Sequence, residues 1–157
     1  MTAYDFDLIV IGSGPAGLSA AYFLARKGYP VTVFEAGPEA GGMLRSSLPV
    51  YRLPKDVVDR DIRNVTALGV EVRINAPVES LARLRQEGFD AVLTAIGTPK
   101  PKKLMVPGED LSGVLSGIEF LAEVLCGQKL DLRGKRVMVI GGGNVAVDAA
   151  RTALRLG

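Results

Sequence analysis

The feature that most constrains the fold is a glycine turn between an apolar run and an amphipathic stretch. Residues Asp7–Ile11 are mainly β-branched or large apolar residues and predict a strand buried on both faces. The next six residues, Gly12–Gly17, match G-x-G-x-x-G and lead into an expected helix. In such a turn Gly12 permits the sharp bend, Gly14 lets a pyrophosphate approach the backbone, and Gly17 lets the helix pack closely on the strand. The stretch therefore predicts a dinucleotide site.

The residues after the turn complete a strand, helix and strand unit. Pro15 and Ala16 fall in the first turn of the expected helix, where free amides and the positive end of the helix dipole favour a phosphate. A second expected strand, Pro30–Phe34, ends at Glu35, with Ala36 behind it. An acid at this point accepts hydrogen bonds from ribose hydroxyls and repels a 2′-phosphate. The unit thus suits FAD or NAD and disfavours NADP. The alternative is that the glycine turn serves only to pack the helix against the strand and binds no nucleotide.

Composition excludes several classes of function. The 157 residues are enough for one domain, and a net charge of +2 is too small to indicate nucleic acid or an anionic membrane surface. No apolar run is long enough for a membrane span, and the N-terminus carries Asp5 and Asp7 where a signal peptide would have a basic region and an apolar core. With one cysteine, Cys126, and no histidine, the chain cannot form an internal disulfide, a zinc or iron–sulfur site of its own, or a Ser-His or Cys-His couple. These counts suit a cytoplasmic protein, and Cys126 is expected to be buried on an apolar helix.

Further elements are expected between this unit and the end of the chain. The loop after Glu35 contains Gly41 and Gly42, which either approach a ligand or simply connect elements. Apolar periodicity and glycine boundaries predict five more elements: helix Pro54–Leu68, strand Val70–Ile74, short helix Ser80–Gln86, strand Ala91–Ile96 and helix Gly117–Leu125. The last of these begins with capping-box spacing, Ser116 followed by Glu119. Between them, Thr98–Val106 is expected to be a solvated connection.

A second glycine turn follows near the end of the chain. Arg136–Ile140 predicts a strand, and Gly141–Ala146 matches G-x-G-x-x-A at the start of a helix that runs to about Leu156. The strand end that would distinguish NAD from NADP is not in the sequence, so the chain is expected to be a fragment. Two such fingerprints in one chain indicate an enzyme that brings two dinucleotides together.

With these motifs in place, the sequence resembles the family of the NADPH-dependent glutamate synthase small subunit, within the flavoproteins that have two dinucleotide-binding domains. The resemblance covers nearly the whole chain and is carried by VIGSGPAGLSAAYFLARKGYPVTVFEA, GGML, LPVYRLP, FDAVLTAIG, VPGEDLSGV and GKRVMVIGGGNVAVDAARTALRLG. It implies a Rossmann-like α/β fold with a parallel sheet. Residues 1–130 would be the N-terminal part of an FAD domain, and residues 131–157 the first βα unit of a truncated NAD(P)H domain.

The resemblance also implies site residues. Those expected around the FAD adenosine diphosphate are Gly12, Gly14, Pro15, Ala16, Gly17, Glu35 and Ala36, with Val78 near the adenine and Ala95 and Gly97 at a strand end near the FAD. Those expected along the path to the flavin are Gly42, Met43, Leu44 and Arg52. Those expected at the pyrophosphate of NADPH, with NAD not excluded, are Gly141, Gly143, Asn144 and Ala146.

The function implied is hydride transfer from NADPH to FAD, with electrons passing to an iron–sulfur partner or subunit. The rest of the flavoprotein would be a further partner, and no side chain of this chain is expected to act as acid, base, nucleophile or metal ligand. Family members commonly carry an N-terminal cysteine-rich segment for iron–sulfur clusters, which this sequence does not contain. Disulfide reductases of the wider group place a redox cysteine pair just after the Gly-Gly, and the segment after Gly42 has no cysteine. Two alternatives stay open: a non-catalytic nucleotide-binding or scaffold fragment, and an NAD-dependent dehydrogenase that uses the first fingerprint alone.

Overall fold

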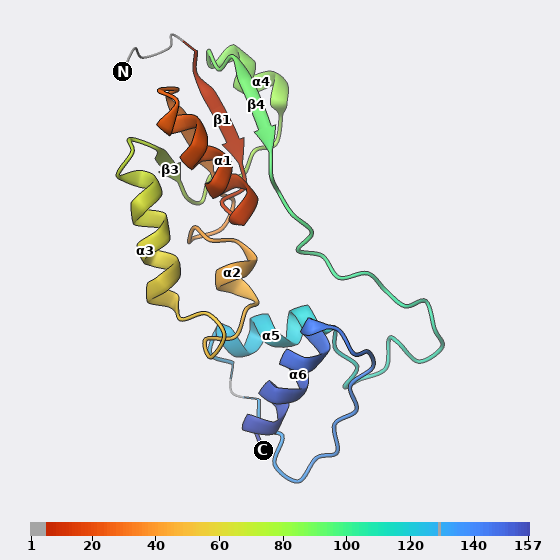
Figure 1. Ribbon diagram of the computed structural model, residues 1–157. Helices are drawn as coiled ribbons and strands as arrows, with labels where there is room; N and C mark the ends of the chain where they lie inside the picture. The colour runs from red at the N-terminus through yellow and green to blue at the C-terminus, as the bar shows by residue number, and fades with distance from the viewer. Residues whose placement is uncertain (1–5, 129) are drawn as a thin grey trace. The chain divides into compact units, whose positions relative to one another are not determined.

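The computed structural model describes residues 6–128 and 130–157. The chain divides into two compact units (Figure 1). The first comprises Met1–Arg45 and Pro54–Gly97, and the second comprises Ser46–Leu53 and Thr98–Gly157.

The first unit is built on a parallel sheet of four strands. These are β1 (Leu8–Ile11), β2 (Val31–Phe34), β3 (Glu71–Arg73) and β4 (Ala91–Thr94), in the order β3-β2-β1-β4. All three pairings are parallel, and Leu8 of β1 lies opposite Val31 of β2 and Ala91 of β4. The carboxyl ends of β1, β2 and β4 therefore meet at one edge of the sheet, which is where a doubly wound fold binds its ligands.

Two helices cover one face of this sheet. The chain forms α1 (Pro15–Arg26) directly after the first glycine turn and α3 (Lys55–Thr66) after the loop that follows β2. Leu8 and Val10 point to the same face, since side chains alternate along a strand, and they join the apolar sides of both helices in one core. The buried residues of this core are Leu8, Val10, Leu18, Ala21, Val31, Val33, Val65 and Val70.

Two shorter helices complete the first unit's sequence of elements. The four-residue α2 (Met43–Ser46) follows the Gly41-Gly42 pair, and α4 (Leu81–Gln86) precedes β4. The Ser80 hydroxyl accepts a hydrogen bond from the Arg83 amide, 3.4 Å away, which caps α4. The predicted strands and helices of this unit are confirmed, with ends that differ by one or two residues. Helix α3, for example, ends before Gly69, whose φ of +90° suits glycine.

The second unit contains two helices, α5 (Gly117–Leu125) and α6 (Asn144–Arg155). They pack through buried Phe120 and Leu121 on α5 and Ala149 and Ala153 on α6. The predicted cap of α5 is confirmed, since the Glu119 amide donates to the Ser116 hydroxyl over 3.1 Å. That hydroxyl in turn donates to the Glu119 carboxylate over 2.8 Å.

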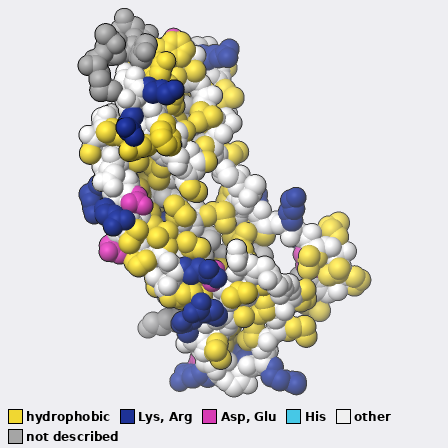
Figure 2. Space-filling model, in the orientation of Figure 1, with side chains coloured by type: hydrophobic (Ala, Val, Ile, Leu, Met, Phe, Trp, Pro, Cys, Tyr) yellow, Lys and Arg dark blue, Asp and Glu magenta, His cyan; other side chains and the backbone are white. Residues whose placement is uncertain are grey.

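A long loop joins β4 to α5 and exposes several apolar side chains. The Glu109 carboxylate accepts hydrogen bonds from the backbone amides of Leu104, at 2.8 Å, and Met105, at 2.9 Å. Leu104, Met105 and Leu111 are exposed, and Figure 2 shows hydrophobic side chains at the surface of this part of the chain. The expected solvated connection is confirmed, although apolar as well as charged residues lie on its surface.

Two sequence predictions for the second unit are wrong. Arg136–Ile140 forms no strand, and Val137, Met138 and Ile140 are 52%, 85% and 77% exposed. A strand needs a neighbour to accept and donate its backbone hydrogen bonds, and all four strands of the described residues belong to the first unit. Cys126 is exposed instead of buried, because it caps the C-terminal end of α5 beyond the packed turns of that helix.

Candidate functional site

The first glycine turn has a shape that only glycine fits at two of its positions. Gly12 has a φ of +100°, and a Cβ there would lie 2.4 Å from the Ala95 carbonyl oxygen. A Cβ on Gly17 would lie 1.9 Å from the Gly12 carbonyl oxygen, so this glycine lets α1 start close to the end of β1. Both distances are far inside van der Waals contact.

Gly14 differs from its two neighbours in the motif. It is the N-cap of α1, with Pro15 in the first turn, and a Cβ on Gly14 would meet no protein atom within 4 Å. Its lack of a side chain therefore serves no packing within this unit. A bare backbone beside the free amides of a helix N-terminus is the arrangement that receives a phosphate.

Glu35 lies beside this turn at the end of β2. Its Oε2 accepts hydrogen bonds from the Ser13 amide, at 3.0 Å, and from the Ser13 hydroxyl. Its Oε1 accepts from the Gly37 amide at 2.8 Å. Burial raises the pKa of the Glu35 carboxyl, but the hydrogen bonds from Ser13, Gly37 and Ala36 outweigh it and hold that pKa below its ordinary value. Glu35 is therefore an ionised acceptor at the carboxyl end of β2.

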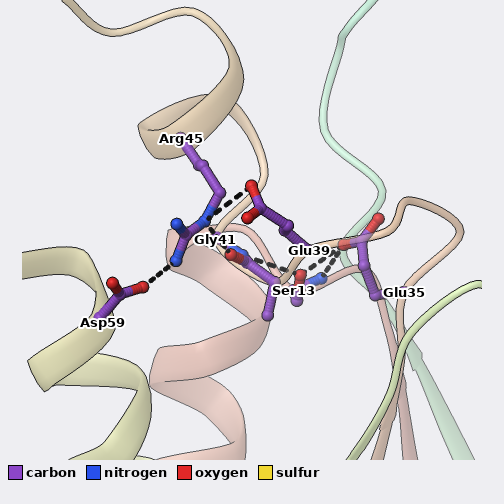
Figure 3. A network of polar contacts seen from close by, with 7 residues as sticks. Ser13, Glu35, Glu39, Gly41, Arg45 and Asp59 are labelled. Carbon is purple, nitrogen blue, oxygen red and sulfur yellow. Dashed lines mark hydrogen bonds and ion pairs between the residues drawn. The ribbon is translucent and has the colours of Figure 1, made fainter. Parts of the chain in front are cut away.

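Ser13 connects the first glycine turn both to Glu35 and to the loop that contains Gly41 and Gly42, which we call the Gly-Gly loop (Figure 3). Its side chain is fully buried. The Gly41 amide donates to the Ser13 hydroxyl and to the Ser13 carbonyl, at 3.1 Å in each case. Ser13 was not predicted as a site residue, because the motif G-x-G-x-x-G leaves its position unspecified. Its hydroxyl side chain, placed between two glycines, was the one feature of the sequence that could have indicated a role.

The Gly-Gly loop packs directly on the turn. A Cβ on Gly42, which has a φ of +53°, would lie 2.8 Å from the Gly14 Cα. Arg45 holds the loop from the other side: its Nε donates to the Ala40 carbonyl over 2.8 Å, and its guanidinium pairs with Asp59 of α3. Met43 and Leu44 begin α2 and are half-buried.

Other expected FAD residues lie at the same edge of the sheet. The Ala95 amide donates to the Ile11 carbonyl over 2.7 Å, and the Ala95 backbone is the surface against which Gly12 packs. Gly97 follows with a φ of +65°. The Ala76 amide donates to the Glu35 carbonyl over 2.9 Å, and the half-buried Val78 lies two residues further along.

The second glycine turn lies in the second unit and is open to solvent. Gly141 has a φ of +118°, and Gly143 is the N-cap of α6, which begins at Asn144. A Cβ on Gly143 would meet no protein atom within 4 Å, while one on Gly141 would make an ordinary 3.7 Å contact with the Ala146 Cβ. The helix N-terminus of a nucleotide turn is thus present, without a strand before it.

Arg52 occurs in the second unit, where it pairs with a residue that the sequence analysis missed. Its Nε donates to the carboxylate of Asp148 on α6, a residue only 3% exposed, and the Tyr51 hydroxyl donates to the same carboxylate over 3.1 Å. The guanidinium groups of Arg151 and Arg155 lie 4.6 Å and 4.2 Å from the centre of the Tyr51 ring. The spacing of the second motif gave no signal for Asp148.

Comparison with known protein families establishes the family of the chain. Residues 6–157 match the pattern of the family described as pyridine nucleotide-disulphide oxidoreductase. The chain belongs to this family. The chain spans between 22% and 36% of the length of the curated relatives described next.

Three named relatives illustrate this. The chain is 47% identical over 152 residues to the NADP(+)-dependent formate dehydrogenase subunit beta of Moorella thermoacetica, covering 94% of the chain and 22% of that protein. It is 45% identical over 157 residues to the NADPH-Fe(3+) oxidoreductase subunit beta of Geobacter sulfurreducens, covering 94% and 23%. It is 37% identical over 172 residues to the glutamate synthase [NADPH] small chain of Halomonas elongata, covering 100% and 36%. The resemblance inferred from the sequence is confirmed.

A solved structure supports the fold. FprA of Mycobacterium tuberculosis, in complex with NADPH, aligns with a TM-score of 0.81 and 27% identity over 94% of the chain and 36% of FprA. The expected α/β class with a parallel sheet is confirmed. In residues 6–128 and 130–157 no group of three or more Cys, Asp or Glu is placed to hold a metal. No helix in the same ranges has the length and apolarity to cross a membrane.

Proposed function

We propose that the chain is the nucleotide-binding part of an NADPH-dependent flavoprotein oxidoreductase of the glutamate synthase small-subunit kind. FAD would bind at the first turn and NADPH at the second, as the sequence predicts, with NAD not excluded at the second. The observation that carries the proposal is the ionised Glu35 carboxylate beside the open Gly14 backbone. An acid at that place accepts from ribose hydroxyls and disfavours a 2′-phosphate, so NADPH belongs elsewhere.

The residues of the first site divide the binding between them. The amides at the start of α1 would meet the pyrophosphate, and Gly14 would keep a side chain away from it, while Gly42 lets its loop pack against the Gly14 backbone. Glu35 accepts from the adenosine ribose. The other expected contacts, from Ala36, Met43, Leu44, Val78, Ala95, Gly97 and Arg52, stay predictions, as do Gly141, Gly143, Asn144 and Ala146 at the second site. So does the division into an FAD part, 1–130, and the start of an NAD(P)H domain, 131–157.

Bound FAD would supply the chemistry, accepting a hydride from NADPH and releasing electrons one or two at a time. The protein's part is to hold both cofactors and exclude a 2′-phosphate from the first site. The names of the relatives favour a subunit of a larger assembly, because two of them are called subunit beta and one is called small chain. We propose an iron–sulfur protein or subunit as the acceptor, and a cytoplasmic location in line with the single cysteine.

The alternative is a non-catalytic nucleotide-binding or scaffold role. The absence of a strand before the second turn, among the described residues, favours it for the chain by itself. A nucleotide turn without its strand has no sheet edge to complete the site.

The test uses the purified 157-residue chain and a full-length protein that contains it. Binding of FAD by the chain would be measured by the quenching of flavin fluorescence, and flavin in the full-length protein by its release on denaturation. Under anaerobic conditions NADPH is expected to bleach the flavin absorbance of the full-length protein faster than NADH does. Bound flavin with no bleaching by either nucleotide favours the non-catalytic role, and no flavin in either protein overturns the FAD assignment.

A further inference from the structure

The hydroxyl of Ser13 has one possible orientation. It lies between the Glu35 carboxylate and the Gly41 amide, which is 3.1 Å from it. An amide can only donate and an ionised carboxylate can only accept, so the hydroxyl accepts from Gly41 and donates to Glu35. The hydroxyl is fully buried, which keeps water from replacing either partner.

The same contacts determine how Glu35 is presented. Each oxygen of a carboxylate has about two acceptor positions. Ser13 uses both of those on Oε2, through its amide and its hydroxyl. Oε1 accepts from the Gly37 amide at 2.8 Å, so the turn holds one oxygen of the carboxylate and the segment after β2 holds the other. The orientation of the carboxylate is set before any ligand binds.

We propose that Ser13 is the positioning residue of the first nucleotide site: its hydroxyl orients Glu35 for the adenosine ribose and ties that acid to the Gly-Gly loop. This rests on the proposed FAD function. The loop is held in turn by Arg45, which donates to the Ala40 carbonyl over 2.8 Å and pairs with Asp59 of α3. Figure 3 shows the contacts running from Asp59 to Glu35.

The charge of Glu35 is compensated by these hydrogen bonds and not by an ion pair. The charged groups on the elements around it have other partners. Arg73 of β3 pairs with Glu71, and Arg45 of α2 pairs with Glu39 and Asp59. Among the described residues, no ion pair to Glu35 is found. Removing the Ser13 hydroxyl therefore removes a stabilising interaction of the ionised form that nothing nearby replaces, and the pKa of Glu35 is expected to rise.

Three variants of the 157-residue chain test the proposal. Ser13→Ala removes the hydroxyl, Glu35→Gln removes the charge, and the double variant measures their coupling. Ser46→Ala is the matched control, since Ser46 is exposed and its hydroxyl lies only near that of Ser47. We expect Ser13→Ala to weaken FAD binding about tenfold, consistent with the loss of a hydrogen bond to a charged group. The double variant should bind scarcely less tightly than Glu35→Gln.

The pH dependence separates positioning from general loosening of the fold. As the pH is lowered, FAD binding by Ser13→Ala should begin to weaken at a higher pH than FAD binding by the unmodified chain, because Glu35 is protonated sooner. Glu35→Gln should show no such weakening, since it has no carboxyl group at this position. Carboxyl ¹³C NMR of Glu35 measures the same shift without FAD. If Ser13→Ala does not fold, Ser13→Cys, similar in size with a weaker donor, takes its place.

The outcomes are distinguishable. An unchanged Glu35 pKa in the Ser13 variants overturns the positioning role, and so does unchanged FAD binding with the same pH profile. Failure of the unmodified chain and the full-length protein to bind FAD overturns the proposed function instead, whatever the NMR result.

Discussion

At the residue scale, the three glycines of the first turn serve two different purposes. A side chain on Gly12 or Gly17 would collide with backbone atoms of this chain, while one on Gly14 would meet none. Gly12 and Gly17 are therefore required by the fold, and Gly14 is required only if something else approaches it. Binding and stability should separate when these positions are substituted.

We expect Gly17→Ala to destabilise the chain by about 1–3 kcal/mol, because the new methyl group would overlap the Gly12 carbonyl. Gly14→Ala, at a φ of −68°, should change stability by less than about 1 kcal/mol, the difference between Gly and Ala at an N-cap. It should nevertheless reduce FAD binding strongly. Urea unfolding and flavin fluorescence measure the two effects. Gly14→Ala with full FAD affinity would contradict a pyrophosphate contact there.

Glu35 gives the chain a pH-dependent stability. Its pKa is lowered in the folded state, so its contribution is complete above the unfolded-state pKa and is lost as the pH falls through the folded-state value. In Glu35→Gln one carboxylate oxygen becomes an NH₂ group, which cannot accept the hydrogen bond that Ser13 or Gly37 donates there. The substitution should therefore lower the free energy of unfolding by about 1–3 kcal/mol at neutral pH. The difference from the unmodified chain should shrink as the pH falls below the unfolded-state pKa of Glu35 and through its lowered folded-state pKa. Urea unfolding across this pH range measures it, and a constant difference would refute it.

Sequence reasoning reached Glu35 and the glycines because their roles follow from backbone geometry that the motif encodes. It did not reach Ser13 or Asp148. Both residues act through partners that are distant in sequence: Gly41 and Glu35 for Ser13, and Tyr51 and Arg52 for Asp148. A motif reports spacing along the chain, and these contacts depend on which loops the fold brings together.

At the scale of elements, a physical reason explains why the helix predicted at Gly117–Leu125 forms and the strand predicted at Arg136–Ile140 does not. Helix α5 satisfies its backbone hydrogen bonds within itself, and its cap, Ser116, is three residues from Glu119. Arg136–Ile140 has the composition of a strand, but a strand is completed only by a neighbour, and the described residues of the second unit contain none. Composition could not reveal that absence.

The cap of α5 gives a prediction at this scale. Ser116→Ala removes the acceptor for the Glu119 amide and should destabilise the helix by about 1 kcal/mol. Ser112→Ala, at an exposed position in the preceding loop, serves as the control and should have no effect. Circular dichroism during urea unfolding measures both. Equal stability of the two variants would show that the cap seen in the structure contributes nothing.

At the scale of the whole molecule, the two nucleotide turns belong to different compact units. A ligand that binds only folded chain stabilises what it contacts, by about 2.7 kcal/mol when its concentration is one hundred times its Kd. FAD should therefore slow amide hydrogen exchange in the first unit, chiefly at Gly12–Gly17 and around Glu35. NADPH should act on Gly141–Ala146 and the start of α6 instead.

Hydrogen exchange followed by mass spectrometry tests this assignment with each nucleotide alone and with both. Gly14→Ala serves as the control, because it should remove the FAD effect and leave the NADPH effect intact. Protection of the first turn by NADPH, at concentrations where FAD has no effect, would reverse the assignment. It would mean that the Glu35 carboxylate tolerates a 2′-phosphate, which its ionised state and its hydrogen bonds to Ser13 argue against.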